Sequence, residues 1–145
     1  MQRTLSLAVA LVAAFALLAA SAAAKGLPGH LLIKAKSVDR VDVGPEGDSL
    51  GDMTILRFSV FQARSGRRIG AGHGYCVRTD VGRASTCTAN SSLPGGRIVL
   101  QWEAHDGDRA FRAAIIGGTG GYLSVSGQMR LTSLSPTEVS TGAGS

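Results

Sequence analysis

The sequence predicts an all-β protein, an antiparallel sheet closed into a small β-barrel around an apolar interior. Apolar and polar residues alternate with a period of two through most of the chain after residue 29. Gly, Pro and Asp interrupt the alternation at intervals of roughly 10–15 residues, and no amphipathic helical pattern is found there. Short connections make neighbouring strands antiparallel, and seven or eight such strands close into a barrel or pack as a sandwich.

The alternation defines the strands and the turns in chain order. Strands are expected at 31–38, 54–62, 69–77, 84–92, 97–104 and 111–115, with two short strands in 122–134 broken at Gly127. The connecting turns lie at 44–52, 65–67, 80–83, 93–96 and 106–108. The glycine cluster 117–121 has the composition of a phosphate-binding loop, but such loops precede a helix. Strand-like residues follow it here, which favours a turn or a bulge.

On each strand one face is mainly apolar. The faces comprise positions 31, 33 and 35; 56, 58 and 60; 69, 71, 73, 75 and 77; 98, 100, 102 and 104; and 111, 113 and 115. Large residues such as Phe58, Trp102 and Phe111 occur there with small ones such as Ala71 and Ala113. A small barrel needs that mixture to fill its tapering interior.

The first 24 residues predict a cleavable secretory signal. Arg3 gives a short positive region, residues 5–20 are almost entirely apolar, and small residues at 21–24 precede Lys25. The apolar run is shorter than the roughly 20 residues that span a bilayer, which disfavours a membrane anchor. We therefore expect a signal peptide at 1–24, one barrel domain at 25–134 and a flexible polar tail at 135–145. The protein would be secreted, with no membrane contact after cleavage.

The charge pattern argues against several functions. The net charge is +5, or +4 without Arg3, and the basic residues are scattered. Nucleic-acid binding needs a concentrated basic stripe, so we do not expect it. His30, His73 and His105 lie far apart, which gives no metal-ligand spacing. No nucleophile motif of a hydrolase is present either, and we expect neither metal nor cofactor.

Cys76 and Cys87 predict one disulfide. If the hairpin turns between Val81 and Gly82, directly opposite residues have numbers that sum to 163, as these two do. Opposite residues in an antiparallel pair lie about 4.5–5.5 Å apart between Cα atoms, which suits a disulfide. The alternative is a reactive Cys76 with Cys87 as its resolving partner. The exported context favours the structural bridge, because disulfides persist outside the cytosol.

Three stretches in order resemble the allene oxide cyclase-like barrel proteins, which are related to plant dirigent proteins. They are Gly47-Asp48-Ser49-Leu50-Gly51-Asp52; Gly66-Arg67-Arg68-Ile69-Gly70 with Gly74-Tyr75-Cys76-Val77; and Leu93-Pro94-Gly95-Gly96 with Gly117-Gly118-Thr119-Gly120-Gly121-Tyr122. The resemblance spans about residues 30–134 and is greatest to the exported bacterial branch.

The resemblance implies an eight-stranded barrel with a lipocalin-like cavity, and in related proteins often a homodimer or homotrimer. Such barrels orient a reactive apolar molecule during cyclisation or coupling and use no cofactor. Lys34 stands near the place of a cavity-facing carboxylate of the plant cyclases. Family members usually end on a further apolar strand, whereas residues 136–145 are polar and small. We therefore expect either seven strands with an open edge or a flexible tail.

The candidate site residues fall into two groups. Asp48 and Asp52 flank the mouth loop and, with Tyr75, are candidates for acid–base catalysis; the alternative for the aspartates is turn and capping chemistry. If the face of strand 69–77 points inward, His73 and Tyr75 are polar groups in an apolar cavity, as in a ligand site. The alternative is that they are satisfied in the core or at its rim. The expected ligand-binding set is His73, Tyr75, Trp102, Phe58 and Phe111.

Two functions fit these features. The first is an isomerase- or cyclase-type guide that binds a small apolar metabolite and steers its ring closure or coupling. The second is the same barrel without catalysis, either carrying a small ligand or serving as a structural protein. A cavity of roughly 300 Å³ or more supports a ligand in either case.

Overall fold

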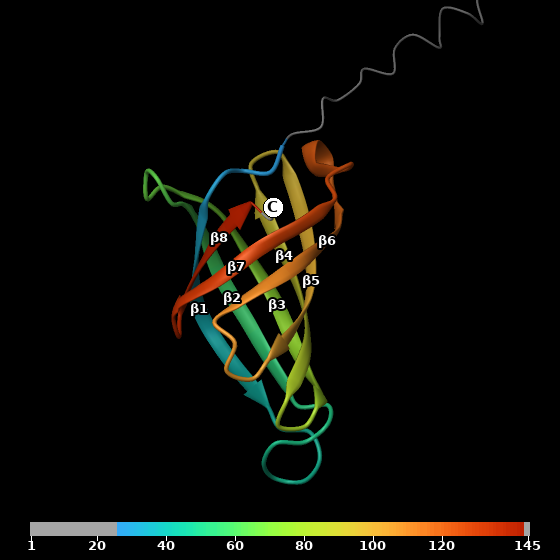
Figure 1. Cartoon of the computed structure of the whole chain (residues 1–145). Coiled ribbons are helices and arrows are strands. Elements are labelled where there is room, and N and C mark those ends of the chain that lie inside the picture. Colours follow the sequence, from blue (N-terminus) through green and yellow to red (C-terminus); the bar gives the residue numbers. More distant parts are fainter. Residues whose placement is uncertain (1–25, 144–145) are drawn as a thin grey trace, which may run out of the picture.

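The computed structural model describes residues 26–143, which form a closed, eight-stranded antiparallel barrel (Figure 1). The strands are β1 Leu31–Val41, β2 Met53–Gln62, β3 Arg68–Asp80, β4 Ala84–Leu93, β5 Gly96–His105, β6 Ala110–Gly118, β7 Gly127–Ser135 and β8 Glu138–Ala143. One short 3-10 helix, Gly120–Tyr122, follows β6. The predicted fold class is confirmed. The expected signal peptide and its cleavage site lie outside the described residues.

Each strand pairs with the next along the chain, and β8 pairs with β1 to close the barrel. The closing seam is short: it joins Leu32, Ile33 and Lys34 to Ser140, Val139 and Glu138. The C-terminal residues therefore differ from the expected flexible tail. Their small polar side chains suit a strand that needs only one inward face, and Val139 and Thr141 supply that face opposite Ser133 and Leu131.

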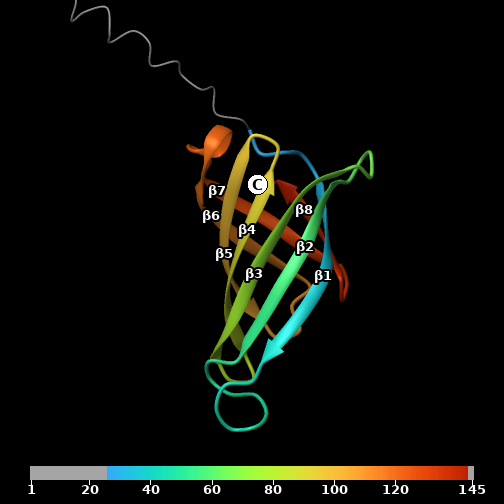
Figure 2. The same ribbon diagram turned by 180° about the vertical axis from the view of Figure 1, so that it is seen from behind.

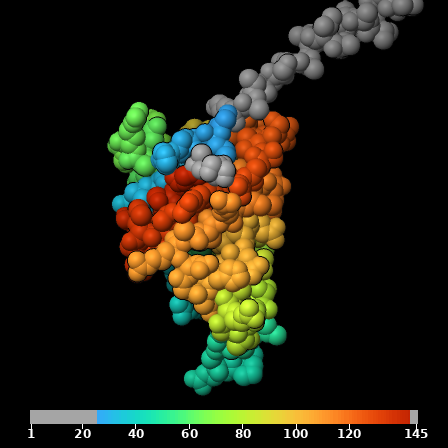
Figure 3. Space-filling view, viewed as in Figure 1, coloured from blue at the N-terminus to red at the C-terminus, as the bar shows by residue number. Residues whose placement is uncertain are grey.

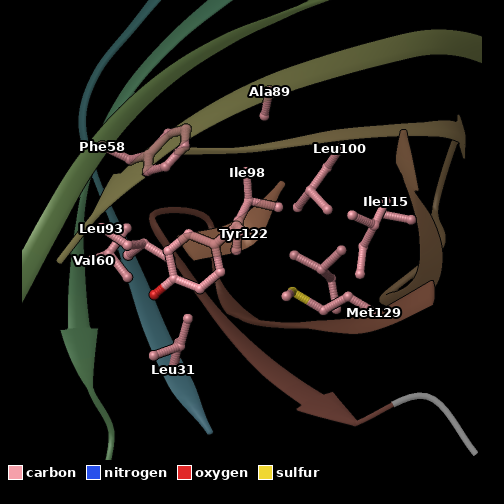
Figure 4. Packing of buried hydrophobic residues seen from close by; sticks show 12 residues of the cluster. Leu31, Phe58, Val60, Ala89, Leu93, Ile98, Leu100, Ile115, Tyr122 and Met129 are labelled. Atoms are coloured by element: carbon pink, nitrogen blue, oxygen red, sulfur yellow. The ribbon is translucent and has the colours of Figure 1, made fainter. Parts of the chain in front are cut away.

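The end of the barrel opposite loop 42–52 is packed solid. Figure 4 shows Val60, Ile98, Leu100 and Met129 converging there from β2, β5 and β7. Val60 and Ile98 are only 1% and 2% exposed. The void left among these side chains is about 20 Å³, which is too small for a ligand.

Tyr122 closes this packed end. Residues 122–126 form no strand, contrary to the expectation; the 3-10 helix turns Tyr122 into the core, where it is 3% exposed and its hydroxyl donates to the Pro94 carbonyl at 3.1 Å. The glycines before it allow this turn, because a side chain at Gly118 would collide with the Tyr122 backbone. Within the cluster 117–121, Gly117 and Gly118 end β6 just after a register shift between Val99 and Leu100, and the remaining residues turn the chain into the 3-10 helix, in agreement with the expected turn or bulge.

From Gly70 to Gly74, the face of β3 that points inward is formed by glycines. Gly72 pairs with Phe58, and a Cβ at Gly72 would collide with the Phe58 ring. The large residues of β2 thus occupy the space that β3 leaves free. His73 and Tyr75 consequently lie on the outer face, and Tyr75 is 45% exposed. The apolar face of this strand was identified correctly, but it points outward.

The β3–β4 hairpin has the predicted register. From Ala71 to Arg78, every β3 residue lies opposite the β4 residue that brings the sum to 163, and a bulge then shifts the pairing at Asp80. Cys76 and Cys87 are opposite each other and form a disulfide, with a Cα–Cα distance of 4.0 Å. The predicted bridge is confirmed.

The two halves of the barrel differ in their walls. β1 to β4 run on toward loop 42–52, whereas β6 to β8 cross only the other half (Figures 1 and 2). We call the half nearer loop 42–52 the lower half. β5 pairs with β6 only from Ile98 to Gln101, so these strands separate below that level. Figure 3 shows the narrowed lower half, covered by the loops around residues 45–50 and 80–83.

Candidate functional site

A row of inward-facing residues crosses the lower half and defines the candidate site. Pairing of opposite residues places Arg40, Thr54, Cys76, Cys87 and Trp102 side by side across β1 to β5. The members of such a row lie on one face of the sheet. Cys87 is fully buried, so this face is the interior. The row therefore runs from a cation on β1, across the disulfide, to an aromatic ring on β5.

A pocket of about 640 Å³ opens in front of this row. Its walls include Arg40, Thr54 and Cys76, together with Arg78 and Ser85 one step closer to the end of the barrel. Loop residues complete it, namely Asp42, Gly47, Asp48 and Asp52. We call this pocket the lower mouth. Its volume lies within the roughly 300–1,000 Å³ of small-molecule sites.

An aromatic pair lies at the β5 end of the same inward-facing row. Trp102 on β5 and Phe111 on β6 stack with ring centroids 5.5 Å apart and planes 16° from parallel. They face each other below the level at which β5 and β6 cease to pair. Both are half-buried, so part of their surface is free to meet a ligand. Phe58, by contrast, is buried in the packed core.

Arg78 binds two loops at the lower mouth. Its Nε lies 2.7 Å from Asp48 of loop 42–52, and its Nη1 lies 2.8 Å from Asp106 of the β5–β6 loop. The hydrogen bond to Asp106 and the charges of both carboxylates raise the pKa of Arg78 above its ordinary value. Asp48 also accepts a hydrogen bond from the Gly82 amide at 2.6 Å. The side chains of Arg78 and Asp48 are therefore both occupied by contacts that hold the loops in place.

Asp52 is occupied in the same way by its own turn. It accepts hydrogen bonds from the backbone amides of Val43 at 2.8 Å and Ser49 at 2.9 Å, and from the Ser49 hydroxyl at 3.0 Å. The amide bonds of Val43 and Ser49 lower the pKa of Asp52, since they favour its charged form. This arrangement is that of a turn-capping residue, the alternative that the sequence left open.

Arg40 differs from Arg78 because it makes no ion pair within the part of the chain that the structure describes. Thr54 and Ser85 line the lower mouth beside it, and no hydrogen bond of their hydroxyls is found in that part either. The lower mouth thus offers one free guanidinium and two hydroxyls as contacts for polar atoms of a ligand. Among the described residues no cluster of His, Cys, Asp or Glu could hold a metal ion.

The structure divides the predicted ligand-binding set. Trp102 and Phe111 stack at the junction of the two halves, where β5 and β6 cease to pair, and Phe58 lies in the packed core. His73 and Tyr75 are on the other side of the sheet, where they line an open outer hollow of about 600 Å³ with Arg57, Ile55 and Met53. Phe58 also borders that hollow, whereas Trp102 does not. The candidate acid–base residue Tyr75 is likewise separated from Asp48 and Asp52 by the sheet.

Lys34 also lies outside the barrel. It pairs with Glu138 of β8 at 2.7 Å, and its ammonium group lies 5.7 Å from the centre of the Phe61 ring. Ile33 and Ala35 are the neighbours that face inward, opposite Val60 and Phe58. The position near Lys34 therefore contributes to the closing seam and not to the cavity.

Sequence reasoning missed Arg40, Arg78, Thr54 and Ser85. A signal for them was present, because Thr54 and Arg78 share the strand faces of Leu56 and Cys76. The hairpin register places Ser85 opposite Arg78. Once the disulfide is placed in the interior, residues two positions away along each strand must also point inward.

Comparisons with known proteins agree with this description of the fold. No protein-family model and no curated protein sequence matches the chain. Among solved structures, the chain is similar to a pyocyanin demethylase, with 27% identity and a TM-score of 0.68 over 77% of this chain and 94% of that one. An exo-specific intermolecular Diels-Alderase is 14% identical with a TM-score of 0.59, covering 77% and 88%.

A third similar structure is the pterocarpan synthase dirigent protein, which is 13% identical with a TM-score of 0.61 and covers 77% of this chain and 81% of that one. The last two likenesses, at such low identity, show a shared fold. The protein therefore has a barrel-type fold, and this fold also occurs in a dirigent protein and in a Diels-Alderase.

Proposed function

We propose that this protein is an exported dirigent-like or allene oxide cyclase-like barrel, which binds a small, largely apolar ring compound in its lower half. There it guides a cyclisation or coupling of that compound without a cofactor. The observation that carries the proposal is the contrast between the two halves. One half is packed solid, while the other holds a pocket of about 640 Å³ beside a half-buried aromatic stack.

The chemistry of the walls supports an orienting role. Trp102 presents a flat surface to a planar ring, and aromatic pairs contribute about 0.5–1.5 kcal/mol beyond their buried area. Arg40 and Thr54 can fix a polar atom of the same molecule toward the opposite end of the row, and Ser85 offers a further hydroxyl in the pocket wall. A ligand held at both ends has few orientations, and restricting orientation can by itself accelerate and direct ring closure.

The names of the similar structures support the same kind of function. Two of them are named for bond-forming chemistry, a Diels-Alderase and a pterocarpan synthase dirigent protein, and the third for demethylation of pyocyanin. A non-catalytic carrier is the second candidate, and one observation favours it. Asp48 and Asp52, the carboxylates expected to serve as acid or base, are held by Arg78 and by the turn.

The proposal is tested by native mass spectrometry of the protein recovered outside the producing cells. We expect a chain that begins at Lys25, contains the disulfide and carries a small organic molecule. The variant Trp102→Ala should bind that molecule roughly 2–10-fold more weakly, the equivalent of one lost aromatic contact. His73→Ala, on the outer face, is the matched control and should bind it normally.

Guide and carrier are then distinguished by product stereochemistry. Phenol couplings and ring closures run with and without the protein should differ in enantiomeric excess if the barrel is a guide. Unchanged enantiomeric excess, with binding intact, would leave the carrier role. Equal binding by Trp102→Ala and by the unaltered protein would contradict the assignment of the lower half as the site.

A further inference from the structure

The lower mouth contains two arginines that differ in exposure and in ion pairing, and this difference indicates a role for Arg78. Arg40 is exposed and makes no ion pair within residues 26–143, whereas the side chain of Arg78 is 19% exposed and paired with two carboxylates. A guanidinium held by two acids is poorly available to a ligand. It can, however, fix the segments that carry those acids.

The segments joined by Arg78 are distant in sequence. Asp48 belongs to the loop between β1 and β2, and Asp106 to the loop between β5 and β6. Asp48 is further held by the Gly82 amide of the β3–β4 turn, and the Asp106 amide donates to the Arg83 carbonyl at 2.8 Å. The backbone of Arg78 takes part as well, since its amide donates to Asp52 at 2.8 Å and its carbonyl accepts from Gly51 at 3.0 Å.

These contacts lie at the opening of the pocket. Loop 42–52 supplies Gly47 and Asp48 to the wall of the lower mouth, and no strand of the other half reaches this level (Figure 1). Apart from these links, the loop packs little apolar surface: Leu50 is 64% exposed and Val43 is 45% exposed. Segments with few buried apolar contacts open at low free-energy cost, so the loop should open more often when the ionic links are lost.

We propose that Arg78 is a positioning residue, a latch that fastens loop 42–52 and the β5–β6 loop over the lower mouth and so controls entry to the pocket. The two carboxylates hold one guanidinium from two sides, a geometry that the planar fork of arginine permits and the single ammonium of lysine does not. Because the latch is ionic and partly solvent-exposed, salt weakens it. The inference does not depend on which ligand the pocket takes.

The chain contains its own reporter of the latch. Trp102 is the only tryptophan in the sequence, it is half-buried, and it lies at the β5 end of the inward-facing row whose members Arg40, Thr54 and Cys76 line the pocket. Quenching of its fluorescence by acrylamide measures how often a small molecule reaches the interior. Acrylamide is uncharged, so removing a charge from the protein does not change its local concentration.

The experiment compares acrylamide quenching in the full chain and in Arg78→Gln, Asp48→Asn and Asp106→Asn. We expect the quenching constant to rise by roughly twofold or more in each variant, because an ion pair that closes the mouth is lost. Salt at 0.5 M should raise the quenching constant of the unaltered protein and leave that of Arg78→Gln unchanged. Asp80→Asn, which removes the exposed Asp80–Arg83 pair at the same end, is the matched control and should quench normally.

Thermal unfolding of each variant shows whether it is folded. If Arg78→Gln loses its cooperative transition, the two aspartate variants decide the question, since both sit on exposed loops. Quenching constants equal to those of the unaltered protein in Asp48→Asn and Asp106→Asn would overturn the latch. An equal rise in Asp80→Asn would overturn it too, because general loosening of this end would then explain the effect.

Discussion

At the scale of single residues, the glycines of β3 determine which way the strand faces. Gly72 faces Phe58, and an added Cβ would also meet the Asn90 carbonyl, which belongs to the backbone of β4 and cannot move away cheaply. We expect Gly72→Ala to lower the free energy of unfolding by about 1–3 kcal/mol, the usual cost of overpacking a well-packed site. Urea denaturation measures this directly.

Gly117 in β6 is the matched control for Gly72. A Cβ there would meet no atom within 4 Å, and the residue does not need a positive φ. Gly117→Ala should therefore leave stability unchanged or raise it slightly, because alanine restricts the unfolded chain. Similar unfolding midpoints for the two variants would mean that the Gly72–Phe58 contact does not set the inner face of β3.

Asp52 leads to a prediction about pH. Its pKa is lowered below the ordinary value of 3.8 by the amides of Val43 and Ser49. A group with a lowered folded-state pKa stabilises the fold above its unfolded-state pKa, and this contribution is lost as the pH falls through the folded value. We expect Asp52→Asn to melt a few degrees lower than the unaltered protein at pH 7, with the difference shrinking below pH 3.8.

Melting curves at pH 7 and at pH 3 provide the test. Asp42→Asn is a suitable control, since the Asp42 side chain makes no hydrogen bond or ion pair among residues 26–143 and should show no such pH-dependent difference. A gap between Asp52→Asn and the unaltered protein that stays constant with pH would show that the carboxylate charge is not what holds the turn.

At the scale of elements, the sequence predicted pairing better than it predicted orientation. The β3–β4 register followed from the turn at 80–83, because a hairpin register is fixed by its turn. The apolar alternation of β3 then suggested that His73 and Tyr75 point inward. That inference was wrong, since a glycine carries no hydrophobic signal although it faces a large neighbour across the sheet.

The candidate site was partly predictable for the same reason. Trp102 and Phe111 were identified because large aromatic residues on an alternating strand are a local signal. Arg40 and Arg78 were not, because a charged residue on a strand ordinarily points to solvent. Their inward position depends on the lower half lacking β6 to β8, a property of the whole barrel that no local pattern records.

At the scale of the molecule, closure of the barrel depends on its least expected strand. Besides three residue pairs, the β1–β8 seam includes a hydrogen bond from the Ala35 amide to the Thr137 carbonyl at 2.8 Å. The Leu31 amide donates to the hydroxyl of Thr141, which is 4% exposed, and the His30 ring nitrogen lies 3.0 Å from the Thr141 carbonyl. The hydroxyl of Thr141 in β8 thus satisfies a backbone amide of β1, which an apolar side chain at that position could not do.

Removing residues 136–145 should therefore open the barrel at two edges at once. The inner sides of β1 and β7, where Leu31 and Leu131 are 4% and 5% exposed, would lose their cover. Domains are stable by only about 5–15 kcal/mol, so losing one strand of eight from a single core should abolish the cooperative thermal transition. A chain lacking only residues 144–145 is the control. If the shorter chain instead keeps a cooperative transition within a few degrees of that control, the seven remaining strands suffice and β8 closes the barrel without stabilising it.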